Sequence, residues 1–281
     1  MVSLPDLHNK FFQTASVMVL NRAATFLLGI ITARLLGPEQ FGLYSFVMSV
    51  VAILALPVVA GLPNLLVREI SKYHLTSNWQ YLMGIINWSR IYIVLISSLV
   101  IFGVHVVLKL DTFDEVTSVI ILTAVFLLPF RGVIIQQSAV ITGLTRPSTA
   151  QLIEGGLLPI ITISVIGFCM YAGINFSVII MVYISLIASI FALFVGVVIL
   201  RKIIKNSVEI CEPKYSIKQW HRSLKPFALM AFVITLNAEL AAVLLGSLSD
   251  NESVGYFKLA MQGVSLLALG LTGVNTVIMP T

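Results

Sequence analysis

The chain has 281 residues, of which 58% are hydrophobic and 10% are charged, and its mean hydropathy is +1.02. Soluble proteins carry about 25% charged residues, so this composition excludes a soluble enzyme, a soluble nucleic-acid-binding protein and a disordered regulator. The net charge of +5 is no evidence for a nucleic-acid partner, because cytoplasmic loops of membrane proteins are rich in Lys and Arg and account for the excess. The sequence therefore predicts an integral membrane protein.

Apolar segments long enough to cross a bilayer follow one another along the chain. A hydrocarbon core needs about 20 apolar residues per helix, and the alternating pattern of outer-membrane β-barrels is absent from the sequence. Pro57, Pro129 and Pro159 fall inside such segments and predict kinks. We therefore predict an all-α polytopic membrane protein with eight transmembrane helices, at residues 11–36, 40–62, 84–108, 117–143, 150–172, 175–200, 226–248 and 254–279.

Basic residues gather in alternate loops, which predicts the orientation of the chain. If the N-terminus is cytoplasmic, the outer loops hold mainly acids, with Lys109 as their one cation and Arg34 at a span end. The positive-inside rule then places both termini in the cytoplasm. The inner loops hold Lys10, Arg68, Lys72, Arg146, Arg201, Lys202, Lys205, Lys214, Lys218, Arg222 and Lys225.

Sequence motifs for catalysis and metal binding are missing. Cys169 lies in an apolar segment and Cys211 in a basic loop, so neither a disulfide nor a metal site is expected. The four histidines have no ligand spacing, and neither a G-x-x-x-x-G-K-[ST] loop nor an H-E-x-x-H pair occurs. We expect a protein that is not an enzyme and holds no cofactor.

A motif at the end of the first predicted span returns near the end of the chain. Glu39-x-x-Gly42-x-Tyr44 recurs 213 residues later as Glu252-x-x-Gly255-x-Phe257. Six predicted spans separate the two copies, which predicts parallel repeats related by an axis along the membrane normal. We therefore predict a six-helix lobe at residues 1–200, a basic cytoplasmic linker at 201–225 and the first two helices of an incomplete second lobe at 226–281.

The same junction carries a family resemblance. The stretch Arg34-Leu-Leu-Gly-Pro-Glu-Gln-Phe-Gly-Leu-Tyr44, with Asn21-Arg22 before it and Gly61-Leu-Pro-Asn64 after it, resembles the N-terminus of bacterial polysaccharide exporters. These are the O-antigen and capsule flippases of the multidrug/oligosaccharidyl-lipid/polysaccharide exporter superfamily. The resemblance covers essentially the whole chain, although only this junction is distinctive.

The resemblance implies two six-helix lobes around a central cavity in the bacterial inner membrane. It also implies a lipid-linked oligosaccharide as substrate, with membrane lipids and polysaccharide assembly proteins as further partners. The chain departs from the family pattern because most of the second lobe is missing. We therefore expect either a truncated form or a protein whose missing wall a partner supplies.

Four cations inside predicted spans are the candidate substrate-binding residues, because a charge costs several kcal/mol at the middle of a membrane. They are Arg22, Arg90, Arg131 and Lys258. Guanidinium groups bind phosphate bidentately, so a cavity lined by these residues suits a pyrophosphate and its sugars. Three alternatives stay open: an arginine paired with a buried carboxylate, Arg90 reaching the inner headgroups, and Lys258 snorkelling outward.

Two acids lie in predicted spans beside these cations. Glu239 is centrally placed and is either an ion-coupling site or the counter-ion of Arg22. Glu154 lies near the cytoplasmic end of its span, where an interfacial position is expected.

The leading hypothesis is a flippase that moves an undecaprenyl-pyrophosphate-linked oligosaccharide, such as an O-antigen unit, from the inner to the outer leaflet. A cation-coupled drug exporter of the same superfamily is the alternative, although four cations against two acids disfavour cationic drugs. A non-transporting membrane scaffold, or an inactive truncated relative, is a further alternative.

Overall fold

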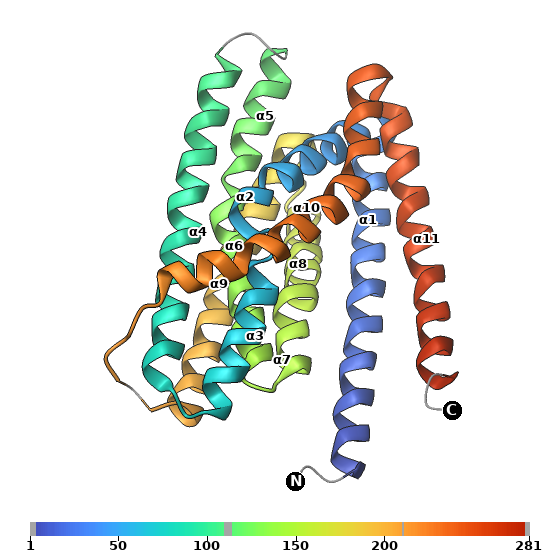
Figure 1. Cartoon of the computed structure of the whole chain (residues 1–281). Helices are drawn as coiled ribbons and strands as arrows, with labels where there is room; N and C mark the ends of the chain where they lie inside the picture. The colour runs from blue at the N-terminus through green and yellow to red at the C-terminus, as the bar shows by residue number, and fades with distance from the viewer. Residues whose placement is uncertain (1–3, 110–113, 210, 279–281) are drawn as a thin grey trace.

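The computed structural model describes residues 4–109, 114–209 and 211–278, and within these ranges the chain forms helices without any strand (Figure 1). The prediction of an all-α fold is confirmed. The elements are α1 (Leu4–Leu54), α2 (Leu56–Val59), α3 (Leu62–Leu75), α4 (Trp79–Leu108), α5 (Glu115–Val125), α6 (Leu127–Gly143), α7 (Pro147–Gln151), the π-helical turn η1 (Leu152–Gly156), α8 (Leu157–Tyr171), α9 (Val178–Ser207), α10 (Ile217–Leu248) and α11 (Asn251–Ile278).

Six helical stretches in the described ranges are long and apolar enough to cross a membrane. The first contains a break at Gly37, where φ is 74° and ψ is 170°, a backbone conformation that glycine adopts without strain. This break separates the predicted spans 11–36 and 40–62, and α11 coincides with the predicted span 254–279. The count of eight spans stays a prediction. The six stretches are Ser16–Leu54, Trp79–Leu108, Glu115–Gly143, Pro147–Tyr171, Val178–Ser207 and Ile217–Leu248.

Three interruptions of these helices lie next to prolines. A proline has no N–H to donate to the carbonyl four residues earlier, and its ring clashes with that carbonyl. Pro159 therefore cannot bond the carbonyl of Gly155, and the π turn η1 includes that glycine. The kinks predicted at the prolines are thus present, at the α1–α2 break before Pro57, the α5–α6 break before Pro129 and the η1 turn before Pro159.

The buried core lies between α3, α4 and α6, and α10 is anchored to it. Leu65 and Ile70 of α3 and Ile85 of α4 are fully buried in one apolar cluster. Trp220 of α10 is also fully buried there, and its Nε1 donates to the hydroxyl of Tyr73 at 3.1 Å. Figure 1 shows α10 running diagonally across the bundle from this anchor toward α11.

The predicted linker at 201–225 is helical at both ends, because α9 extends to Ser207 and α10 begins at Ile217. In Figure 1, α1 begins and α11 ends at one end of the bundle, whereas the turn between α10 and α11 lies at the other. The segment predicted as lobe one (residues 1–200) contacts the segment predicted as the start of lobe two (residues 226–281) along α1, which packs against both α10 and α11.

Two glycines of the repeated motif form close contacts where α1 meets the α10–α11 hairpin. A side chain at Gly42 would overlap the backbone carbonyl of Asn251, and one at Gly255 would lie 2.9 Å from the carbonyl oxygen of Pro38. Under the 213-residue offset, Pro38 corresponds to Asn251 and Gly42 to Gly255. The two contacts are therefore each other's copies, as a two-fold relation between repeats requires. Superposition of the two segments stays a prediction.

Candidate functional site

A polar cleft of about 400 Å³ lies between α1, α6, α10 and α11. Its α1 wall carries hydroxyls, and charged or amide side chains come from the other three helices. Thr32 and Ser49 donate to carbonyls of their own helix, at 2.8 and 2.9 Å, so their oxygens remain able to accept hydrogen bonds from a ligand. The polar residues that line this cleft are Thr25, Thr32, Tyr44, Ser45, Ser49, Arg131, Glu239, Lys258 and Gln262.

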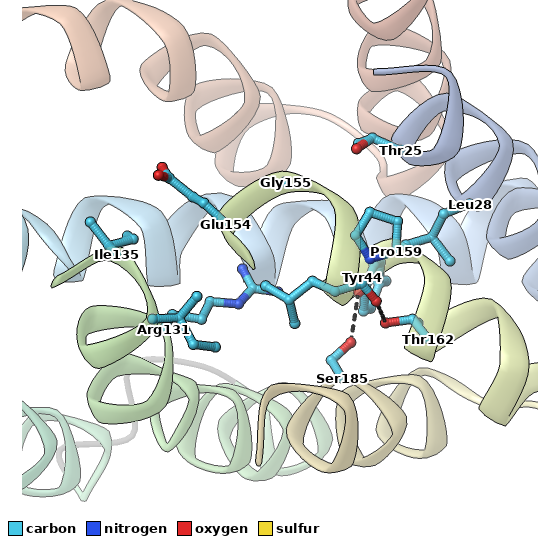
Figure 2. Close-up of a pocket in the computed structure, with 12 residues that line it drawn as sticks. Thr25, Leu28, Tyr44, Arg131, Ile135, Glu154, Gly155, Pro159, Thr162 and Ser185 are labelled. Atoms are coloured by element: carbon cyan, nitrogen blue, oxygen red, sulfur yellow. Dashed lines mark hydrogen bonds between the residues drawn. The ribbon is translucent and has the colours of Figure 1, made fainter. Parts of the chain in front are cut away.

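A second cavity of about 280 Å³ adjoins the cleft inside the first nine helices, and we call it the inner cavity (Figure 2). Tyr44 and Arg131 line both spaces. The hydroxyls of Tyr44 and Ser185 share a hydrogen bond of 3.2 Å that joins α1 to α9 (Figure 2). Glu154 and Thr162 complete the polar part of the inner cavity.

Arg131 lies at the boundary between the two spaces. Its Nε is buried and has no hydrogen-bond partner, and no ion pair with Arg131 exists among the described residues. A buried donor without a partner is costly, more so for a charged group. Arg131 therefore carries a positive charge at the boundary of the two spaces that no carboxylate of the described residues neutralises.

Lys258 and Glu239 face each other across the α10–α11 hairpin. Lys258 Nζ lies 2.5 Å from Glu239 Oε2, and their side chains are 20% and 23% exposed. Lys258 therefore points into the cleft instead of snorkelling outward. Of the two alternatives for Glu239, the structure does not show the pairing with Arg22, because Glu239 is paired with Lys258 from the neighbouring helix; the ion-coupling role stays a prediction.

Gln262 adds an amide to the α11 wall of the cleft. Its Oε1 is buried without a hydrogen-bond partner. The side chain lies against Gly29 of α1, where even a methyl group would collide with it. Gln262 was not among the predicted site residues, because an uncharged amide in a membrane span is weaker evidence of a functional site than a cation.

The other two predicted cations do not line the cleft. Arg22 is exposed on α1, one helical turn before Thr25. Arg90 is exposed on α4, on the outward face that also carries Ile91 and Leu95, which are 57% and 63% exposed. The structure therefore brings Arg131, Lys258 and Glu239 together and leaves Arg22 and Arg90 outside.

Glu154 is exposed and lines the inner cavity, and its interfacial position stays a prediction. The π turn η1 directs it along the inner cavity, where its Oε2 accepts a hydrogen bond of 2.6 Å from Ser138 Oγ. Asn21 braces this turn against α1 by donating to the carbonyl of Gln151 at 2.7 Å. The sequence signal was Glu154-Gly155-Gly156 followed by Pro159, a pattern that weakens a regular helix.

Comparison with known proteins identifies the family. The model of a family described as polysaccharide biosynthesis protein matches residues 7–281. A search of curated proteins found no match, and neither did a search of solved structures. Members of the matched family are transporters and not enzymes, in agreement with the multi-pass helical fold described above. The resemblance noted at the Arg34–Tyr44 junction is confirmed, and the chain belongs to the polysaccharide biosynthesis protein family.

Proposed function

We propose that the protein is a flippase for a lipid-linked oligosaccharide, with an undecaprenyl pyrophosphate carrier as the anionic group. The observation that carries this proposal is Arg131, a half-buried cation without an ion-pair partner among the described residues, at the edge of a polar cleft inside a membrane-spanning bundle. A guanidinium offers a rigid fork of donors that matches phosphate oxygens bidentately. The pyrophosphate would therefore bind at Arg131.

The opposite wall of the cleft suits the sugar. Gln262 lines the cleft with an amide side chain, and the hydroxyls of Thr32 and Ser49 have free acceptor capacity. Sugar hydroxyls both donate and accept hydrogen bonds. The amide and the hydroxyls on this wall can therefore bond to a sugar without covalent chemistry. Transport then needs only alternating access, in which the walls of the cleft rock about the bound substrate.

The charge of the cleft disfavours a drug exporter. Lys258 neutralises Glu239, so the net charge of the cleft is the positive charge of Arg131. A positive cleft repels cationic drugs. We propose that Arg22 meets the substrate at the approach to the cleft, because it lies one turn from Thr25. Arg90 faces outward on α4 and is proposed to contact lipid headgroups.

We further propose the bacterial inner membrane as the location, with a cytoplasmic N-terminus. The support is the run of exposed cations at the end of α9 and the start of α10, including Arg201, Lys205 and Lys218. Excess Lys and Arg is typical of cytoplasmic loops. Substrate would then enter the cleft from the inner leaflet.

Complementation of a bacterial strain that lacks its own O-antigen flippase tests this function. We expect Arg131→Ala to abolish surface polysaccharide while the protein stays in the membrane, since the lost group is a ligand contact. Arg131→Lys should restore only part of the activity, because an ammonium keeps the charge but loses the fork. Arg90→Ala is the matched control and should export normally. Normal export by Arg131→Ala at equal abundance would contradict the proposal.

A further inference from the structure

We propose that α3 and the first half of α10 together form a binding site for the headgroup of an anionic phospholipid. None of its residues lines the cleft, so the inference goes beyond the proposed function and does not depend on it. Five exposed cations form its polar part, and we call them the basic surface. They are Arg68 and Lys72 of α3 and Lys218, Arg222 and Lys225 of α10.

Two contacts between α3 and α10 bring the two halves of the basic surface together. The Nε1 of Trp220 donates to the hydroxyl of Tyr73 at 3.1 Å, and the guanidinium carbon of Arg68 lies 5.3 Å from the centre of the Phe227 ring. The helices therefore pass each other in opposite directions. Residues 68–73 of α3 lie against residues 220–227 of α10, and these two stretches hold four of the five cations.

Each helix buries its apolar face and keeps its cations on the opposite face. α3 buries Ile70, whereas Arg68 and Lys72, two residues away on either side, are exposed. α10 buries Trp220, whereas Arg222 is exposed. The other two cations of α10 lie four residues before and three residues after Arg222, on the same helical face. Packing of the apolar faces therefore directs the cations away from the protein.

Carboxylates that could neutralise the basic surface are scarce. Glu69 is the one acid in α3, in α4 and in α10 before Glu239. It is 3% exposed and is bound by Arg68 at 2.6 Å. Glu209 and Glu212, which precede α10, form no ion pair with the basic surface. Four of the five cations thus have no counter-ion within the described residues, and their charge favours an anion from outside the chain.

The start of α10 lies at the level of the lipid headgroups. α4 ends at Leu108, and a hydrocarbon core needs about 20 residues of helix, so its other boundary falls near Trp88. The ring centre of Trp88 lies 5.4 Å from that of Trp220 and 5.2 Å from that of His221. Tryptophan is enriched at the membrane–water interface. The basic surface, which begins beside these rings, is therefore within reach of lipid phosphates.

The cationic face of α10 continues into an apolar one. Leu229 follows Lys225 by one turn on the same face and is 67% exposed, and Val233, one turn further, is 59% exposed. A soluble anion would meet only the cations, whereas a phospholipid offers a phosphate to the cations and acyl chains to the apolar residues. This order of residues along one helix favours an anionic phospholipid over a soluble anion.

The test is native mass spectrometry of the full chain in detergent micelles titrated with phosphatidylglycerol, with phosphatidylcholine as the zwitterionic control lipid. The wild type should bind phosphatidylglycerol more tightly than phosphatidylcholine. A cation near a membrane surface contributes about a fivefold gain in affinity for anionic lipid. The triple variant Lys218→Gln, Arg222→Gln, Lys225→Gln should therefore bind phosphatidylglycerol about 100-fold more weakly and bind phosphatidylcholine as before.

A second triple variant controls for net charge. Arg34→Gln, Lys109→Gln, Arg146→Gln removes the same charge from exposed positions outside α3 and α10, and it should bind phosphatidylglycerol like the wild type. Equal weakening in the two triple variants would overturn the inference, because net charge and not this surface would then attract the lipid. A wild type that binds both lipids equally would overturn it as well.

Competitors distinguish the lipid from other anions. Displacement of phosphatidylglycerol by equimolar glycerol phosphate would assign the surface to a soluble anion, and displacement by an equimolar polyglutamate peptide would assign it to an acidic protein. Either result would overturn the inference. If the α10 triple variant does not fold, Arg222→Gln alone should still weaken phosphatidylglycerol binding about fivefold, and unchanged affinity in that variant would overturn the inference.

Discussion

The two walls of the cleft are built differently. The wall formed by α1 and α6 is part of a bundle in which α1 also contacts α5, α7, α8 and α9. The wall formed by α10 and α11 is a hairpin, held by the Trp220 anchor at one end and by close contacts with α1 at the other. One wall is therefore part of the core of the first nine helices, and the other packs on that core along the length of α1 and through Trp220.

The walls also differ in charge. Arg131 on the α6 wall has no counter-ion in the described part of the chain, whereas Lys258 and Glu239 on the hairpin neutralise each other. A cation that is partly buried without a counter-ion costs free energy, which a bound anion would offset. Moving a neutral ion pair past lipid or protein costs less free energy than moving an unpaired charge. The net positive charge of the cleft therefore comes from the α6 wall alone.

Breaking the attachment of the hairpin should have the largest effect on the structure. Gly42→Leu places a side chain where the backbone carbonyl of Asn251 lies, and backbone cannot move aside cheaply. We expect the hairpin to separate from α1, which would abolish crosslinking between cysteines introduced at Pro38 and Asn251. Gly103→Leu is the control, because nothing lies within 4 Å of that position. Unchanged crosslinking in Gly42→Leu would show that the α1–α11 contact is not as close as described.

The ion pair on the hairpin should show an intermediate effect. Glu239→Ala leaves Lys258 without a partner in the cleft, and removal of one member of a buried pair costs about 3–5 kcal/mol at full burial. The roughly one-fifth exposure of both side chains should reduce this loss of stability. The double variant Glu239→Ala, Lys258→Ala should recover most of the thermal stability in nanodiscs. A double variant as unstable as the single one would show that the two residues are not coupled.

The sequence predicted the helices, the proline kinks and the cations that interrupt apolar spans. It could not predict which way each cation faces. α4 is apolar nearly all round, since lipid and protein core favour the same side chains, so nothing in the sequence places Arg90 outward and Arg131 inward. Charge pairing was equally hidden, because Glu239 meets Lys258 only through the hairpin geometry. The position of Glu154 beside the inner cavity was not predictable, because a π turn shifts the helical register on which facing arguments depend.

The smallest expected effect concerns two aspartates that line one pocket, each of which begins a helix: α5 of the first nine helices and α11 of the hairpin. Asp114 accepts from the backbone N–H of Thr117 at the start of α5, and Asp250 accepts from that of Ser253 at the start of α11. These hydrogen bonds lower the pKa of both carboxyl groups below the usual value for aspartate.

A carboxyl whose pKa is lower in the folded protein adds stability at neutral pH. That stability is fully present above the unfolded-state pKa and is lost as the pH falls through the lower, folded-state pKa. We therefore expect acid pH to loosen both helix starts, detectable as faster hydrogen exchange at Thr117 and Ser253. Asn caps a helix about as well as Asp but does not titrate, so Asp114→Asn and Asp250→Asn should each abolish the acid sensitivity of its own helix start only. Equal loss at both helix starts in either single variant would mean that the hairpin and the core respond to acid as one body, which would contradict the separation of the two walls.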